Sequence, residues 1–271
     1  MNRRTFLTLV GTSTVAQAGL WPFSSLSLGK EEPKKVIIKD NIAPNFVVSQ
    51  KIVLSPKELL SVTELSRKIR RARNVVGYGN FSLLGFDHMR QVGKYHSKVG
   101  VFTKAESALF EKLFYKEASE YGFYGEKVIT SMTNNIKKRE TVKIPRTGHH
   151  LYKGKAEEMY TKVREEVGHS IILTSGVRSV VKQMDLFLAK IVKTHGDVSL
   201  ASNSLAPAGY SFHGVGDFDV GKVGYGYRNF TSDFAQTDEY KKLIDTGYIK
   251  IRYTKNNPFG VRYEPWHIKV V

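Results

Sequence analysis

The residues of this chain that could carry out chemistry are concentrated in its last third. Two histidines, His213 and His267, are accompanied by Asp219 and by Glu264, which precedes the second histidine by three residues. Two imidazoles and one carboxylate form the ligand set of a catalytic zinc site, which leaves one position open for water and requires a nearby base. We therefore expect His213, Asp219 and His267 to bind zinc and Glu264 to act on the water.

The composition is compatible with such a site and limits the alternatives. The chain has 271 residues, 41% hydrophobic and 25% charged, which is typical of a globular protein with one large domain or two modest ones. It has no cysteine, so disulfides and thiolate metal sites are excluded. A transition metal can therefore be bound only by histidine and carboxylate side chains.

The formal net charge of +17 favours anionic partners, which include nucleic acid, anionic lipid and acidic wall polymers. The densest basic run, residues 67–73, falls within a predicted helix, and we interpret it as a solvated face. No nucleic-acid-binding motif accompanies the charge, so we expect no nucleic-acid partner. Steep salt-dependent binding to nucleic acid would contradict that expectation.

The N-terminus predicts export. Arg3 and Arg4 form a twin-arginine pattern that is followed by a short apolar run and by the small-x-small cleavage signal Ala16-Gln17-Ala18. The run is too short for a transmembrane helix, and no later segment is apolar enough to span a bilayer. Removal of residues 1–18 would leave a charge of 17 − 2 = +15 on a soluble protein outside the cytoplasm.

The N-terminal half is predicted to be mostly helical. Capping boxes at Ser55 and Thr103 begin two helices with apolar residues at helical spacing. A glycine-rich stretch over residues 77–93 predicts an irregular loop, and His88 and His96 beside it are interpreted as non-functional. Residues 19–50 are interpreted as a linker that includes one short strand over residues 35–39.

The C-terminal part predicts an α+β fold with a small antiparallel sheet and flanking helices. We expect helices over residues 155–167, 180–194 and 237–246, strands over 170–174, 218–220, 248–254 and 261–270, and a loop over 197–210. The boundary with the helical N-terminal part is predicted at residues 131–147. His149 and His150 follow that boundary, and we expect both to be exposed loop histidines.

Three sequence pieces occur together in this part of the chain. They are Ser175-Gly176-Val177-Arg178-Ser179 with Gln183 four residues later, the stretch from Ser211 to Asp219, and Glu264-Pro265-Trp266-His267. In this order they resemble the zinc D,D-peptidases of bacterial cell walls, which include vancomycin-resistance dipeptidases and carboxypeptidases and several phage endolysins. The family patterns are S-G-Y-R-S-x-x-x-Q, S-x-H-x-x-G-x-A-x-D and E-x-W-H, and the resemblance covers roughly residues 150–271.

The resemblance implies a role for each matching residue. His213 and His267 match the zinc histidines, Glu264 the catalytic base and Arg178 the arginine that stabilises the developing oxyanion. The remaining matches are positions of the substrate cleft, and they are Gln183, Ser211 and Trp266.

The chain departs from the family pattern at the carboxylate ligand. The family places aspartate seven positions after the histidine, whereas here Asp219 stands six positions after His213 and Val220 stands at the seventh. A one-residue slip on a strand would turn the ligand to the wrong face. We expect a loop shortened near Gly214 to keep Asp219 at the metal, with Asp217 as the alternative ligand.

A second geometric condition concerns Glu264 and His267. On a regular strand they would face opposite sides, so both serve one site only if the strand bends or ends there, which Pro265 favours.

These inferences predict four segments: a twin-arginine export signal over residues 1–18, a linker over 19–50, a helical N-terminal region over 51–147 and a zinc D,D-peptidase-like catalytic domain over 148–271. The predicted function is that of a periplasmic zinc metallopeptidase acting on peptidoglycan stem peptides, most simply a D-alanyl-D-alanine carboxypeptidase using zinc-activated water. L,D-carboxypeptidase or cross-link endopeptidase activity, or a non-catalytic wall-binding protein of the same fold, remain the alternatives. The sequence predicts no particular oligomeric state.

Overall fold

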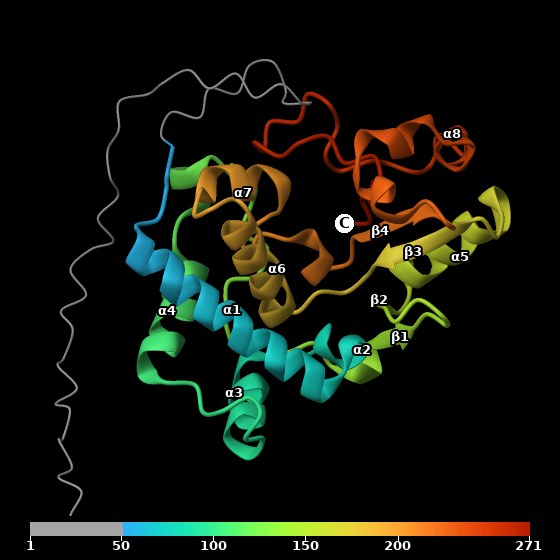
Figure 1. Cartoon of the computed structure of the whole chain (residues 1–271). Helices are drawn as coiled ribbons and strands as arrows, with labels where there is room; N and C mark the ends of the chain where they lie inside the picture. Colours follow the sequence, from blue (N-terminus) through green and yellow to red (C-terminus); the bar gives the residue numbers. More distant parts are fainter. Residues whose placement is uncertain (1–50) are drawn as a thin grey trace, which may run out of the picture.

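The computed structural model describes residues 51–271, and the predicted export signal, linker and strand over residues 35–39 lie outside them (Figure 1). The helices are α1 (Pro56–Val76), α2 (Tyr78–Phe81), α3 (Phe86–Tyr95), α4 (Lys104–Tyr115), α5 (Lys155–Val167), α6 (Val180–Lys193), α7 (Val198–Ser204) and α8 (Asp238–Asp245). The strands are β1 (Thr141–Lys143), β2 (His150–Tyr152), β3 (Ile171–Ser175), β4 (Phe218–Lys222) and β5 (His267–Ile268). The predicted α+β class, with a helical N-terminal region and a small antiparallel sheet, is confirmed.

The first core is helical and spans most of the chain. Helix α1 begins with the predicted capping box, in which Ser55 accepts from the Glu58 amide and Glu58 accepts from the Ser55 amide. Its buried face packs against α6, which lies across it in Figure 1. Each large apolar side chain fully buried in this contact contributes roughly 1.5–3 kcal/mol. The N-terminal helices therefore support α6, the helix that directly follows the Arg178 loop.

The second core lies under the three-stranded sheet, whose order is β3-β4-β5 with antiparallel pairs. Side chains alternate on β4: Phe218 and Val220 are fully buried in this core with residues from α5 and α8. Asp217 and Asp219 therefore point to the opposite face of the strand. A separate hairpin, β1-β2, lies beside the sheet.

The basic run on α1 differs from the predicted solvated face. Lys68 is buried and its ammonium lies 2.7 Å from a Glu106 carboxylate oxygen. Arg70 and Arg73 reach Asp185 on α6 at 3.7 and 3.4 Å. Part of this positive charge is thus used to hold helices together.

The predicted loop over residues 77–93 is wrong, because it contains α2 and α3. Gly93 is required inside α3 by close packing, since a Cβ there would lie 2.7 Å from the Gly100 carbonyl oxygen. Glycine here marks a close approach of two segments of the chain, which a helical residue with a side chain would prevent. His88 and His96 are exposed on α3 and at its end.

The predicted loop over residues 197–210 is also wrong, because residues 198–204 form α7. The Asp197 carboxylate accepts from the Leu200 amide and caps this helix. The predicted strands over residues 248–254 and 261–270 shrink to β5 and an isolated bridge between Ile251 and Ile268. The two segments still run side by side through irregular backbone bonds, such as Lys269 N–H to the Lys250 carbonyl at 2.9 Å.

No helix within residues 51–271 combines the length and the apolar character needed to cross a bilayer. The structure does not test the predicted division of the chain near residue 147, which stays a prediction.

Candidate metal centre

Three buried side chains converge at the edge where β4 and β5 meet the loop after α7. The Nε2 atom of His213 lies 3.2 Å from Oδ1 of Asp219, and Nδ1 of His267 lies 3.4 Å from the same oxygen. One ligand atom from each residue falls within 4.8 Å of the other two. The structure thus brings together the three residues that the sequence predicted as metal ligands.

Backbone pairing places two of the three ligands. Asp219 lies on the central strand β4, where its register partners are Ser175 on β3 and His267 on β5. His213 belongs to a short 3₁₀ turn over Phe212–Gly214, and its Nδ1 lies 2.9 Å from the Gly176 carbonyl oxygen. A carbonyl accepts only, so Nδ1 carries the proton and Nε2 presents its lone pair to the centre.

The donor atoms fit a metal ion of tetrahedral preference. His213 Nε2 and Asp219 Oδ1 are buried and have no hydrogen-bond partner, although buried polar atoms are almost always paired. Two ligand atoms about 2.1 Å from one tetrahedral ion lie about 3.4 Å apart, close to the two distances found here. Two imidazoles and a carboxylate are also the donors that zinc prefers.

Asp217 lies behind His267 and takes no place in the ligand cluster. Its Oδ2 accepts from His267 Nε2 at 3.1 Å, which leaves Nδ1 of that imidazole free to bind a metal. Arg252 forms a short ion pair with the same carboxylate, and the Val270 amide donates to Oδ1 at 2.8 Å. The sequence offered Asp217 as the alternative ligand, and the structure places Asp219 in the cluster and Asp217 in a supporting role.

An irregularity in the neighbouring strand lies opposite Asp219. Leu173 pairs with Val220, but the next partner of β4, Asp219, is Ser175, so Thr174 is the extra residue of a bulge. On the loop side, Gly214 packs so closely that a Cβ would lie 2.3 Å from the Ile129 side chain.

Glu264 stands beside the cluster because the chain turns between it and His267. The His267 amide donates to the Glu264 carbonyl at 3.1 Å, and Pro265 lies within this turn. The Glu264 carboxylate therefore reaches the same side as His267, with Oε2 3.6 Å from Nδ1 of the imidazole. The bend that the sequence required at Pro265 is present.

Arg178 contacts the Asp219 carboxylate of the cluster directly. Its Nη2 donates to Asp219 Oδ2 at 2.6 Å and its Nε donates to Ser175 Oγ at 2.9 Å. Nη1 points to Gln183 Oε1 at 3.4 Å, and the Gln183 amide donates to the Ala206 carbonyl at 2.5 Å. Arg178 and Gln183 thus lie at the site, where they fix Asp219 and one another.

The other two predicted substrate contacts differ in their surroundings. Ser211 is buried directly before the His213 turn. Trp266 is 3% exposed and belongs to the second core, with Phe230 edge-on at 6.0 Å and the Arg262 guanidinium 5.1 Å from its ring. Trp266 therefore packs under the Glu264 turn, and a contact with substrate stays a prediction for both residues.

The prediction that His149 and His150 are exposed is wrong. Both are buried, and the His150 carbonyl accepts from the Val177 amide at 2.8 Å, which draws this segment against the Arg178 loop. Burial, with the charges of Lys182 and Arg178, lowers the pKa of His149 to about 3. Sequence spacing gave no signal for this burial, because the pairing that creates it joins segments about 27 residues apart.

The charges of the cluster are strongly coupled. Burial lowers the pKa of His213 to about 4, with Arg178 adding to the effect. Burial alone would also lower the pKa of His267, but the hydrogen bond with Asp217 and the nearby Glu264 and Asp219 raise it to about 9. One histidine is thus held neutral and ready to bind, whereas a metal must displace a proton from the other.

Comparison with known families identifies the C-terminal part. Residues 149–271 match the family VanY, described as D-alanyl-D-alanine carboxypeptidase. The resemblance predicted from the three sequence pieces is therefore confirmed for this part of the chain. No match was found among the curated proteins.

Several solved structures are similar to part of the chain. The LdcB LD-carboxypeptidase is 23% identical over 51% of this chain and 70% of its own, with a TM-score of 0.39. A vancomycin-resistance VanY D,D-pentapeptidase in complex with Zn(II) is 18% identical over 56% of this chain and 89% of its own, with a TM-score of 0.38. VanXYg, a D,D-dipeptidase in complex with a D-Ala-D-Ala phosphinate analogue, is 19% identical over 58% of this chain and 66% of its own, with a TM-score of 0.40.

Proposed function

We propose that this protein is a zinc metallopeptidase that trims peptidoglycan stem peptides, acting as a D-alanyl-D-alanine carboxypeptidase. The observation that carries the proposal is the convergence of His213 Nε2, Asp219 Oδ1 and His267 Nδ1, all buried, beside the Glu264 carboxylate. The VanY family match over residues 149–271 supports the same activity and substrate class.

His213, Asp219 and His267 would hold the zinc ion. When bound, zinc would polarise the scissile carbonyl and lower the pKa of a water molecule towards neutrality. The protein prepares its ligands through two hydrogen bonds, one from His213 Nδ1 to Gly176 and one from His267 Nε2 to Asp217. Each bond fixes a tautomer and a ring orientation.

Glu264 serves as general base and then general acid. Its position beside His267 lets it accept a proton from the attacking water and return it to the leaving amine of the terminal residue. The carboxylate is 11% exposed, so it is desolvated yet accessible from the site.

Arg178 stabilises the negative charge that develops on the scissile carbonyl oxygen. Its guanidinium pairs with the Asp219 carboxylate, which places a fixed positive charge beside the metal cluster, as the role implied by the family requires. Guanidinium keeps its charge at every pH of interest, so this stabilisation does not depend on a proton.

The test is digestion of defined muropeptides by the purified protein with and without a chelator. We expect about one zinc ion per chain and zinc-dependent release of D-alanine from pentapeptides. His213→Ala should lose the metal. Glu264→Gln should keep it and lose roughly 10²- to 10⁴-fold in kcat, whereas Glu158→Gln, an exposed glutamate on α5, should retain full activity.

The same digestion separates the alternatives. Release of D-alanine from tetrapeptides alone would indicate an L,D-carboxypeptidase, and cleavage of dimers would indicate an endopeptidase. If the protein binds sacculi in the presence of a chelator and releases no product, it is a wall-binding protein and not an enzyme.

We also propose export to the periplasm through the twin-arginine signal at Arg3 and Arg4, supported by the adjoining apolar run and cleavage signal. Arg3→Lys with Arg4→Lys should retain the protein inside the cytoplasm. Unchanged periplasmic recovery of this variant would contradict the proposal.

A further inference from the structure

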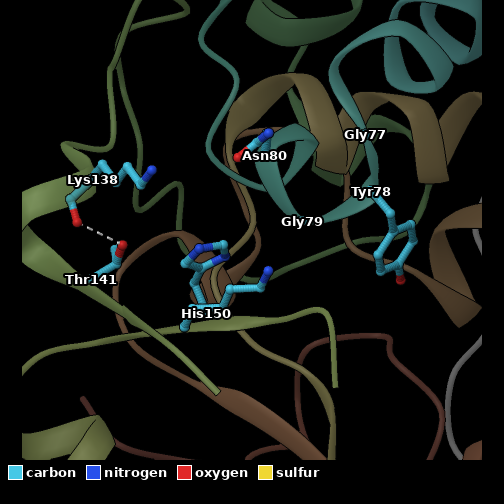
Figure 2. A pocket seen from close by; sticks show the side chains of 8 residues that line it. Gly77, Tyr78, Gly79, Asn80, Lys138, Thr141 and His150 are labelled. Carbon is cyan, nitrogen blue, oxygen red and sulfur yellow. Dashed lines mark hydrogen bonds between the residues drawn. The ribbon is translucent and has the colours of Figure 1, made fainter. Parts of the chain in front are cut away.

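A hollow of about 280 Å³ lies between the turn that carries α2 and the β1-β2 hairpin. Figure 2 shows the His150 ring between Lys138 and Thr141 on one side and the segment from Gly77 to Asn80 on the other. None of the residues lining it is a predicted metal ligand or catalytic residue. Its volume is enough for one amino-acid side chain with its polar end group.

The lining of this hollow carries positive charge without a matching acid. Lys138 and Lys143 are exposed, and neither forms an ion pair with a carboxylate in the part of the chain that the structure describes. The neighbouring Glu140 is paired instead with Lys137 at 3.3 Å. Burial lowers the pKa of His150, and the charges of Lys143 and Lys138 lower it further. An anion placed between the two ammonium groups would relieve this repulsion.

His150 supplies an unused hydrogen-bonding group at the same place. The residue is 4% exposed, and its Nδ1 is buried without a hydrogen-bond partner. A buried polar atom left unpaired costs roughly 1–3 kcal/mol, so such atoms are rare away from ligand sites. The imidazole lines the hollow and its lowered pKa favours the neutral form, in which the ring carries one donor and one acceptor nitrogen.

The hollow shares a wall with the metal centre. The His150 carbonyl accepts from the Val177 amide, one residue before Arg178, and the Gly176 carbonyl accepts from the metal ligand His213. On the other side, the Tyr78 ring lines the hollow and meets His149 edge-on at 5.6 Å. An extended peptide bound at the metal centre could therefore reach the hollow with a neighbouring residue.

We propose that this hollow, formed by Lys138, Lys143 and His150, is a subsite for the carboxylate of an acidic residue in the stem peptide. The inference rests on the proposed function, because that function supplies an acidic peptide in the adjoining cleft. Two ammonium groups and an imidazole donor form charge-assisted hydrogen bonds with one carboxylate, and an amide at the same position would lose the charge.

The test uses a peptide that the proposed reaction does not consume. The tripeptide L-Ala-γ-D-Glu-L-Lys lacks D-alanine, and it can be made with the glutamate α-carboxylate free or converted to an amide. Calorimetry at low salt should show at least tenfold tighter binding of the free acid to the full-length protein. Lys138→Gln with Lys143→Gln should reduce that preference to less than twofold.

Two controls separate a site from general charge. Lys98→Gln with Lys104→Gln removes the same charge from exposed lysines near the start of α4 and should leave the tenfold preference intact. Histidine ring signals in ¹⁵N NMR, assigned through their loss in His150→Gln, should shift with the free acid and not with the amide.

The subsite would be overturned if the two peptides bind equally or do not bind. It would also be overturned if both double variants lose the preference for the free acid to the same extent. Because the tripeptide carries no D-alanyl bond, the result is independent of catalysis. A protein that releases no D-alanine but retains the carboxylate preference would contradict the proposed function and support the subsite.

Discussion

Asp217 and Asp219 are separated by one residue and point to the same face of β4, yet their surroundings give them different roles. Asp219 Oδ1 faces the two imidazoles, whereas Asp217 is enclosed by Arg252, His267 and the amide of Val270. The alternation of side chains along a strand predicted that both aspartates could face the metal, but it could not predict which of them is the ligand. The ranking depends on Arg252, which lies 35 residues away in the chain.

The supporting role of Asp217 predicts a loss of zinc affinity without loss of fold. Asp217→Asn should weaken zinc binding about 10- to 100-fold, because the orienting carboxylate of His267 loses its charge. Competition with a chromophoric chelator measures this affinity. Asp233→Asn, at an exposed aspartate paired with Arg228, is the matched control and should bind zinc as the wild type does. Unchanged affinity in Asp217→Asn would show that the orienting bond is dispensable.

At the scale of elements, the helices with apolar residues at helical spacing were predictable, whereas the capped helix α7 and the irregular segments were not. The predicted helix over residues 155–167 matches α5, because its apolar spacing is helical and Gly168 follows it. The strands over residues 248–254 and 261–270 were overpredicted, because their apolar residues pack on the two cores without forming a regular ladder. Apolar composition reports burial, whereas a ladder also needs continuous backbone pairing, which Pro265 interrupts.

Helix α6 carries a lysine whose burial predicts a pH effect on stability. Burial and the Arg178 charge together lower the pKa of Lys182 to about 7, although Asp185 opposes the shift. The ammonium nitrogen donates to Ser82 Oγ at 2.9 Å and lies 4.4 Å from the centre of the Tyr78 ring.

A lysine pKa lowered in the folded state means that the unfolded chain binds more protons above pH 7, so the free energy of unfolding rises with pH. Relative to Lys182→Met, the wild type should gain about 2–3 kcal/mol between pH 7 and pH 9. Urea unfolding at both values measures the difference. Lys104→Met, at an exposed lysine, is the control, and its difference in stability from the wild type should not change with pH. If the stability difference between the wild type and Lys182→Met is the same at pH 7 and pH 9, Lys182 does not have a lowered pKa.

At the scale of the whole molecule, the two halves of the chain share the first core. The apolar face of α6 is fully buried with residues of α1, α3 and α4, although α6 comes from the part that matches the VanY family. The sequence predicted a helix over residues 180–194 but assigned neither a buried face nor a partner to it. The site ligands could be predicted from residue types and order, whereas the support that the N-terminal helices give to the Arg178 loop could not.

This shared core predicts that residues 148–271 do not fold alone. The isolated fragment would expose Val181, Met184 and Leu188, which are fully buried in the longer chain. We expect this fragment to bind a hydrophobic dye, to unfold without cooperativity and to bind zinc only weakly. The control is the protein of residues 51–271, which should unfold cooperatively and bind zinc tightly. A fragment that unfolds cooperatively and binds zinc would establish an independent domain beginning near residue 148.

The loop that presents Arg178 is held by the main chain on both sides. The Arg178 amide donates to the His213 carbonyl at 3.2 Å, and the Ser179 amide donates to the Ser82 carbonyl at 2.9 Å. Main-chain bonds survive most side-chain replacements. This link between Ser179 and Ser82 therefore depends on the path of the chain and not on either side chain. Relatives could preserve this link between the helices and the metal centre even where their sequences differ. Superposition of backbone structures would then detect the link, whereas sequence alignment would not.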